Sequence, residues 1–360
     1  MIQKRIFLIT LLLYISLWSQ DQEKIYADTL EQLNCMLEDS CELSFKKAVM
    51  GVENAYYNNT LDTVGFNFEI KRLTSFTNTM ANHVTLKYQG KDSLKIKKYA
   101  ALFSVLTDTI PIVNTNGEMF EYIPFFYDFE DIWGLKNWES MFVTKLLESG
   151  KGNCHSLPYL YKILAEETGV DAHLSIAPNH IYIKHRNEID GWYNTELTSG
   201  IFPNDAWLMA SGYIHLDAIT NKMYMEALND KQSIAMCVID LAQGYNKVFP
   251  DNDGEFVMKA CEIALTHYPH YINGRILQAE TKKKIFENEI KKDYDIFDKE
   301  VFEDDYLRLQ FLEIQNEYVS IHESGYRRMP EEMYLSWLNS LKKEREKYEN
   351  KKITNNEKSN

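Results

Sequence analysis

The 360-residue chain has little of what several common classes of protein need. It holds five cysteines and no Cys-x-x-Cys or His-x-x-x-His spacing, so paired zinc ligands are absent and no metal site is expected. No Asp-rich loop resembles a calcium site. Basic residues number 39 against 53 acidic ones, and the net charge of −14 argues against nucleic acid or anionic lipid as the main partner.

The sequence also lacks an apolar run long enough to cross a membrane. Its most apolar segment, residues 6–18, has 13 residues, whereas a spanning helix needs about 17–25. This run follows Lys4 and Arg5 and ends at polar residues, which predicts a secretory signal peptide over residues 1–19 and an exported, periplasmic or extracellular protein. Because Leu17 is not small, an uncleaved N-terminal anchor is the alternative.

What the chain does contain is enough apolar material for packed cores. Hydrophobic residues make up 45% of it and aromatic residues 13%, and the length allows two or three domains. Residues 20–126 are mainly helical in pattern, residues 127–228 mix strands and helices, and residues 229–341 are helical again. Residues 342–360 form a charged tail that we expect to be disordered.

Two local signals lie ahead of the central region. Asn116-Gly117 stands between apolar flanks and predicts a β-hairpin over residues 110–126. Asn137 is a capping residue, and it predicts a helix whose apolar positions are Trp138, Met141, Phe142 and Leu146.

Residues 152–158 have the composition of a helix start. Gly152 frees the backbone, Asn153 can cap, and Pro158 fits the first turn, where backbone N–H groups have no partner within the helix. An apolar stripe then continues until Gly169. Cys154 therefore lies at a helix N-terminus, where the helix dipole favours the thiolate, the nucleophilic form of cysteine.

Two alternating segments follow, residues 180–184 and 192–197, and together they predict an antiparallel hairpin. If the loop is symmetric about Glu188, His180 pairs with Glu196 and Tyr182 pairs with Asn194. His180 and Glu196 then share one face of the sheet. A thiol at a helix start, an imidazole and a carboxylate are the parts of a Cys-His-acid nucleophilic site.

The order Gly-Asn-Cys-His-Ser, then Pro-Asn-His-Ile-Tyr-Ile, then Trp-Tyr-Asn-Thr-Glu-Leu-Thr resembles the bacterial transglutaminase-like superfamily over residues 127–219. The resemblance implies an α+β fold with a papain-like core. Where that family usually has aspartate followed by Pro-Thr, this chain has Glu196, Leu197 and Thr198.

The resemblance implies an acyl-transfer site with Cys154 as nucleophile, His180 as its base and Glu196 as the residue that orients the ring. Asn194 is the alternative orienting residue, and either the Cys154 backbone N–H or the Trp138 indole N–H can support an oxyanion. His155 adjoins the thiol but points about 100° away on a helix, so it is poorly placed as the base. The scheme needs no cofactor.

The substrate class that follows is a peptide or side-chain amide. Water as the second reactant gives hydrolysis, whereas an amine gives cross-linking, and the residues named do not separate the two.

The C-terminal helices suggest a different class of function as the alternative. Leu241, Tyr245, Ala264 and Pro269 lie near the apolar and proline positions of a tetratricopeptide unit, a resemblance that covers one repeat and part of a second. Such surfaces bind protein segments. The chain is then a peptide-binding or scaffolding protein with an inactive core.

The five cysteines leave one odd thiol in an oxidising compartment. Cys35 and Cys41 are six residues apart, and Cys237 and Cys261 lie on consecutive predicted helices. Two disulfides leave Cys154 free. Otherwise these four residues are buried thiols.

Overall fold

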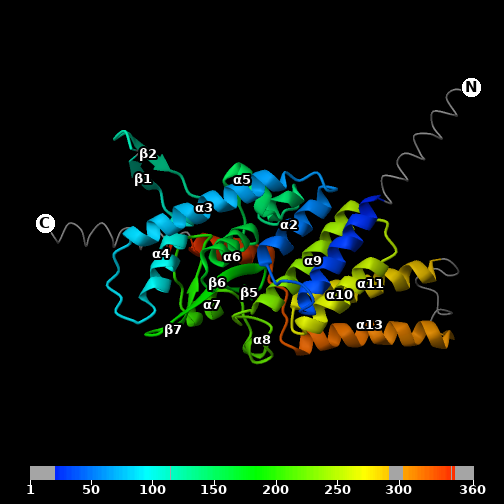
Figure 1. Ribbon diagram of the computed structural model, residues 1–360. Coiled ribbons are helices and arrows are strands. Elements are labelled where there is room, and N and C mark those ends of the chain that lie inside the picture. Colours follow the sequence, from blue (N-terminus) through cyan, green and yellow to red (C-terminus); the bar gives the residue numbers. More distant parts are fainter. Residues whose placement is uncertain (1–20, 114, 292–302, 342, 345–360) are drawn as a thin grey trace, which may run out of the picture. The chain divides into compact units, whose positions relative to one another are not determined.

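The computed structural model describes residues 21–113, 115–291, 303–341 and 343–344. It mixes helices with small sheets, as an α+β protein does (Figure 1). The predicted signal peptide, residues 1–19, and nearly all of the predicted disordered tail, residues 342–360, lie outside the described residues. Within the described ranges, no helix combines the length and apolarity needed to cross a bilayer.

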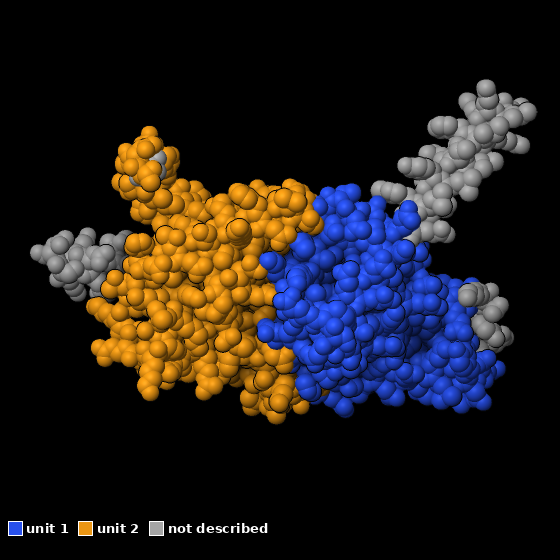
Figure 2. All heavy atoms as spheres, viewed as in Figure 1, with its two compact units in different colours: residues 1–61, 230–323 blue, residues 62–229, 324–360 orange. Residues whose placement is uncertain are grey.

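The chain divides into two compact units, each built from two separate stretches (Figure 2). The first, here called the helical unit, takes residues 1–61 and 230–323. The second, here called the mixed unit, takes residues 62–229 and 324–360. Residues 324–341 therefore belong with the strands of the middle region.

The helical unit consists of packed helices, with no strand among its described residues. Residues 21–37 are helical, and the later helices are α2 (Phe45–Tyr56), α9 (Asp230–Val248), α10 (Glu255–His267), α11 (Ile272–Ile290) and α13 (Asp305–Glu323). α9 packs on α10, α10 on α11 and α11 on α13, and α2 packs on α9. Gly274 permits close packing, because a Cβ there would lie 3.2 Å from Leu265 and 3.3 Å from Ile239.

The cysteines of the helical unit are in two states. Cys35 and Cys41 form a disulfide with a Cα–Cα distance of 5.3 Å. Cys237 on α9 and Cys261 on α10 are buried and are not joined by a disulfide. The Cys35–Cys41 disulfide considered from the sequence is therefore present. Cys237 and Cys261 are buried thiols, which was the alternative.

The mixed unit carries all of the described strands. Its elements in order are α3 (Thr63–His83), α4 (Ser93–Thr107), β1 (Ile110–Val113), β2 (Met119–Tyr122), β3 (Phe126–Tyr127), η1 (Trp138–Met141), α5 (Val143–Ser149), β4 (Lys151–Gly152), α6 (Ser156–Thr168), β5 (His173–Ala177), β6 (His180–Asn187), β7 (Gly191–Thr195), α7 (Asp205–Ser211) and α8 (Leu216–Thr220). Residues 331–341 add a helix from the end of the chain.

The layers of the mixed unit place α6 against the sheet. The three-stranded sheet has the order β5-β6-β7 with antiparallel neighbours, and α6 packs on β5 and β6 (Figure 1). On the other sides α6 contacts α3, α4 and α5. Eleven of its residues are buried, so α6 is the central helix of this unit.

Two sequence signals are confirmed by these elements. β1 and β2 form the hairpin around Asn116-Gly117, and Gly117 has a φ of +82°, in the left-handed region that such turns use. Helix α6 ends at Thr168, and Gly169 adopts the left-handed conformation with φ of 71°.

The predicted hairpin register is wrong by two residues. Lys184 lies opposite Asn194 and Asn187 opposite Gly191, so the loop is centred on Ile189 and not on Glu188. The Asn187 side chain causes this, because its Oδ1 accepts hydrogen bonds from the backbone N–H groups of Ile189 and Asp190. Because the register differs by an even number of residues, each side chain stays on the face of the sheet that was predicted for it.

The continuous helix predicted after Asn137 is also wrong. Asn137 does cap, since its Oδ1 accepts from the Glu139 N–H at 3.0 Å, but it opens only the short 3₁₀ helix η1. Phe142 is extended, with φ of −92° and ψ of 140°, and α5 begins after it. Burial of Phe142 and Val143 in the core fixes this break.

Candidate active site

Cys154 lies in the short connection between β4 and α6, and its neighbours fix the backbone there. β4 pairs in parallel with β3, with Gly152 opposite Tyr127. The Asn153 Oδ1 accepts from the backbone N–H groups of His155, at 2.9 Å, and Ser156, at 3.3 Å. These bonds satisfy N–H groups at the start of α6, as a capping side chain does.

His180 and Glu196 meet at one end of the β6–β7 pair. The His180 Nε2 lies 2.5 Å from Glu196 Oε2, and both side chains are fully buried. The other carboxylate oxygen, Oε1, accepts from the Thr198 backbone N–H at 2.7 Å. The carboxylate is therefore held at both oxygens, and it fixes the orientation of the imidazole ring.

The thiol and the imidazole interact, and each changes the other's pKa. Burial opposes ionisation of the Cys154 thiol, but the hydrogen bond and charge of His180 outweigh burial and lower its pKa below the usual value. Burial also disfavours a charged His180, but Glu196 and Cys154 outweigh it and raise the His180 pKa to about 10. Both directions favour a thiolate beside an imidazolium.

The helix at residues 331–341 brings a tyrosine to this pair. The Tyr334 hydroxyl donates a hydrogen bond to Cys154 Sγ at 3.4 Å and lies 3.5 Å from His180 Nδ1. Because Nε2 is bonded to Glu196, Nδ1 is the imidazole nitrogen on the thiol side. Burial, followed by the nearby Cys154 charge, raises the pKa of Tyr334 well above its usual value, so the hydroxyl keeps its proton and donates.

Aromatic rings enclose the same atoms. The Trp337 ring meets His180 edge to face at 4.5 Å, and the Trp133 ring lies 4.6 Å from that of Tyr334. Tyr127 on β3 is also close, since burial and then the charge of Cys154 raise the pKa of its hydroxyl. The site is thus a buried, largely aromatic enclosure in which charges interact strongly.

The other residues considered from the sequence have different neighbours. The Asn194 amide donates to the Pro203 carbonyl at 2.9 Å and to Asp205 Oδ1 at 2.7 Å. His155 has its Nδ1 2.8 Å from the Met141 carbonyl oxygen. Trp138 lies on η1 and is half-buried. The structure brings Cys154, His180 and Glu196 together, and it is Glu196, not Asn194, that contacts the ring.

Tyr334 and Trp337 were missed by sequence reasoning. The sequence does contain an apolar stripe at the helical spacing i, i+3, i+4, i+7, formed by Tyr334, Trp337, Leu338 and Leu341. All four residues are buried in the structure. The stripe predicts an apolar helix face. It does not say which surface that face covers, because the contact with Cys154 spans 180 residues.

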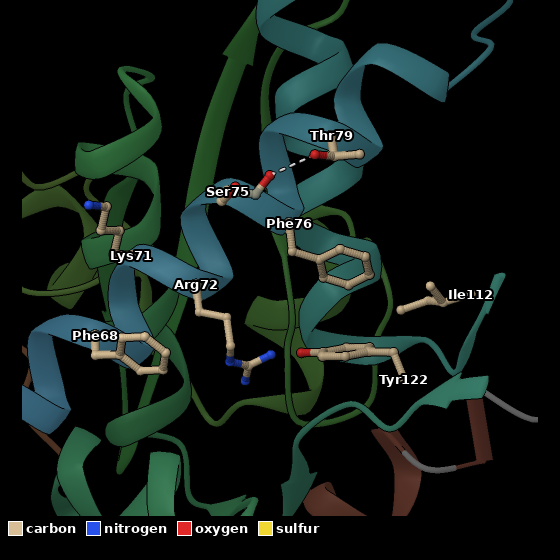
Figure 3. Close-up of a pocket in the computed structure, with 8 residues that line it drawn as sticks. All are labelled: Phe68, Lys71, Arg72, Ser75, Phe76, Thr79, Ile112 and Tyr122. Atoms are coloured by element: carbon tan, nitrogen blue, oxygen red, sulfur yellow. Dashed lines mark hydrogen bonds between the residues drawn. The ribbon is translucent and has the colours of Figure 1, made fainter. Parts of the chain in front are cut away.

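Other hollows of the mixed unit are lined by different residues. One of about 550 Å³ lies between α3 and the β1–β2 hairpin, with Phe68, Arg72 and Phe76 on one side and Ile112 and Tyr122 on the other (Figure 3). Over the described ranges, no three His, Cys, Asp or Glu side chains are grouped closely enough to hold a metal ion.

Comparison with known proteins adds no relative: no family model matches the chain, and no curated protein or solved structure matches it. What the fold and site define is an α+β protein with a buried Cys-His-Glu cluster.

Proposed function

We propose that this protein is a cysteine acyltransferase or amidase of the transglutaminase-like kind, with a papain-like catalytic core, acting on peptide or side-chain amides. The observation that carries the proposal is the cluster of Cys154, His180 and Glu196. One hydroxyl, that of Tyr334, lies 3.4 Å from Cys154 Sγ and 3.5 Å from His180 Nδ1, and His180 Nε2 lies 2.5 Å from Glu196 Oε2. A nucleophile, a base within hydrogen-bond reach of it and a group that orients the base are the three parts that covalent acyl transfer needs.

The roles follow from the geometry. Cys154 attacks the carbonyl carbon as thiolate, and the amide nitrogen leaves with a proton from His180. Glu196 holds the ring by Nε2, so the Nδ1 side faces the thiol and moves that proton. Water or an amine then attacks the thioester, and His180 accepts its proton.

The backbone N–H of Cys154, at the start of α6, is the proposed donor to the oxyanion, because helix N-termini present such groups and favour negative charge. Trp138 is the second candidate for this role. No cofactor takes part in the scheme.

Export and a protein partner on the helical unit belong to the same proposal. The signal-like segment at residues 1–19 and the Cys35–Cys41 disulfide both suit an oxidising compartment. In the helical unit, α9, α10 and α11 pack in sequence order, as repeat helices that bind protein segments do. A scaffolding role without catalysis is the alternative, and the thiol's reactivity separates the two.

The test is the rate of iodoacetamide labelling of Cys154 against pH, in the full-length protein and in His180→Ala, with the site assigned by peptide mass mapping. We expect measurable labelling to persist well below the free-cysteine pKa of about 8.5, and to disappear there in His180→Ala. The physical reason is that His180 supplies both the hydrogen bond and the charge that lower the Cys154 pKa.

Mapping is needed because Cys237 and Cys261 are also outside any disulfide. They serve as the control, since their labelling should be the same in both proteins. If Cys154 titrates as an ordinary thiol in both proteins, the catalytic proposal fails and the scaffolding role is favoured.

A further inference from the structure

We propose that the helix at residues 331–341 is an internal blocker, which closes the thiol site and must move away before a substrate carbonyl can reach Cys154. This inference concerns regulation of the proposed acyl-transfer site and rests on that function for its purpose. The closure itself is a statement about access to one sulfur atom, so it can be tested without turnover.

The contacts show that Tyr334 stands where a reacting group must stand. A carbonyl carbon under attack has to lie against Cys154 Sγ, with its leaving nitrogen near His180 Nδ1. The Tyr334 hydroxyl is 3.4 Å from that sulfur and 3.5 Å from that nitrogen. The two positions cannot be filled together.

Burial shows that the closure is complete from this side. Cys154 is 9% exposed, and the face of the helix that covers the site is buried throughout, with Tyr334 and Leu341 fully buried. Trp337 adds a hydrogen bond from its indole Nε1 to Ser211 Oγ at 3.1 Å. A peptide therefore has no route to the sulfur past this helix.

The helix can leave without breaking the fold beneath it. Its backbone hydrogen bonds run along its own axis, so its attachment depends on side chains such as Tyr334 and Trp337. Its other face is in contact with solvent, where Met333 is 41% and Leu335 37% exposed. Displacement exposes apolar surface but costs no strand pairing.

A tether holds the helix in reach when it moves. Residues 324–330 connect it to α13. The Asn221 side chain donates a hydrogen bond to the Ser324 carbonyl oxygen at 3.2 Å. Gly325 has φ of +99°, and a Cβ there would lie 2.4 Å from the Ala218 backbone nitrogen. This close contact fixes the segment before the helix. The helix itself can then rotate away from the site about that segment.

The aromatic wall that remains suggests what replaces the helix. Trp133 packs on Tyr334 at 4.6 Å, and Tyr127 lies opposite Gly152, two residues before Cys154. Once Tyr334 has left, these rings form a site suited to an aromatic or other large apolar side chain next to the reacting amide. Tyr334 is then an internal occupant of the position that a substrate side chain takes.

The test measures access to Cys154 in the full-length protein by the rate of iodoacetamide labelling at one pH. The variant is Leu341→Ala, which removes a fully buried contact of the helix face and no group of the site. Because labelling requires opening, we expect it at least about tenfold faster than in the wild type, which should itself be at least about 100-fold slower than the urea-unfolded chain.

The matched control is Leu102→Ala, which removes a fully buried leucine of the same unit from α4. It should leave the Cys154 rate within about twofold, since only general loosening would change it. A thermal melt checks that each variant is folded, and Leu338→Ala replaces Leu341→Ala if the latter does not fold. Cys237 and Cys261 report whether the helical unit is intact.

The outcomes separate this inference from the proposed function. Fast labelling of the wild type, or equal acceleration by Leu102→Ala, overturns the blocker. Selective acceleration by Leu341→Ala supports it even if p-nitrophenyl acetate gives no acyl-enzyme burst, a result that would count against the function alone. A burst of equal size and rate in wild type and Leu341→Ala would instead support the function and overturn the blocker.

Discussion

Burial and hydrogen bonding shift the pKa of the Cys154 thiol in opposite directions. Burial alone would raise the pKa of Cys154 and lower that of His180. His180 instead lowers the pKa of Cys154, and Glu196 and Cys154 raise that of His180. The imidazolium's contribution to stability is fully present below its unfolded pKa of about 6.5 and is lost as pH rises through about 10. The thiolate's contribution is lost as pH falls through the lowered Cys154 pKa. The ion pair exists between these limits.

Glu196→Gln tests the carboxylate at this scale. Glu196 is the first cause that raises the His180 pKa, so its neutral analogue should lower that pKa and, through the imidazole, raise the pKa of Cys154. We expect labelling of Cys154 near pH 7 to fall about tenfold or more, since one pKa unit changes the thiolate population about tenfold.

Asn194→Ala is the control for that substitution. Its amide contacts Pro203 and Asp205 and not the imidazole, so the pH profile of labelling should stay at the wild-type position. A shift in Asn194→Ala with none in Glu196→Gln would assign the orienting role to the amide.

At the scale of elements, the site depends on the turn from β4 into α6. Gly152 sits in the parallel β3–β4 pair, opposite Tyr127, and a Cβ there would lie 2.4 Å from Ser156 Oγ and 2.9 Å from Leu146 Cδ1. Ser156 Oγ in turn accepts from the Asn153 N–H at 3.1 Å. The glycine therefore lets strand, cap and helix meet beside Cys154.

Gly152→Ala should disturb both the fold and the thiol. Overpacking of a buried turn costs about 1–3 kcal/mol of unfolding free energy, measured by denaturant titration. We also expect the pH profile of Cys154 labelling to shift, because Asn153 and the start of α6 must move.

Gly150→Ala is the matched variant two residues earlier. Gly150 has φ of +69° and nothing within 4 Å of an added Cβ. It should cost about 1 kcal/mol of backbone strain and leave the pH profile unchanged. Equal effects of the two alanines on that profile would show that the close contact at Gly152 is unimportant for the site.

At the scale of the molecule, the mixed unit contains a second buried histidine that behaves oppositely to His180. His185 stacks on Tyr99 at 3.9 Å and has its Nε2 2.9 Å from the Tyr161 hydroxyl. Desolvation lowers its pKa to about 3. His185 is therefore neutral in the folded protein over the pH range in which an unfolded histidine takes up a proton.

This difference makes the mixed unit sensitive to acid. Below about pH 6.5, His185 takes up a proton in the unfolded chain but stays neutral in the folded chain. The unfolding free energy should therefore fall as pH decreases toward about 3, by at most about 1.4 kcal/mol per pH unit. His185→Gln should flatten this slope in denaturant titrations. His215→Gln, at a half-exposed histidine, should keep it. An unchanged slope in His185→Gln would mean that another group controls acid unfolding.

Local signals in the sequence determined the parts of the site that depend on neighbouring residues. Asn153, Gly169 and Pro158 define the ends of α6, and the two-residue period of strands placed His180 and Glu196 on one face even though the register was wrong by two. These features follow from backbone hydrogen bonding and strand geometry, which act over a few residues.

Only the tertiary structure decided what surrounds that site. Tyr334 reaches Cys154 across 180 residues, the chain returns to the mixed unit after α13, and the helix predicted after Asn137 is broken by the burial of Phe142. Such contacts depend on which apolar faces meet in the folded chain. An amphipathic stripe shows that a face will be buried, but its partner is chosen by shape and packing between distant segments, which no short stretch of sequence contains.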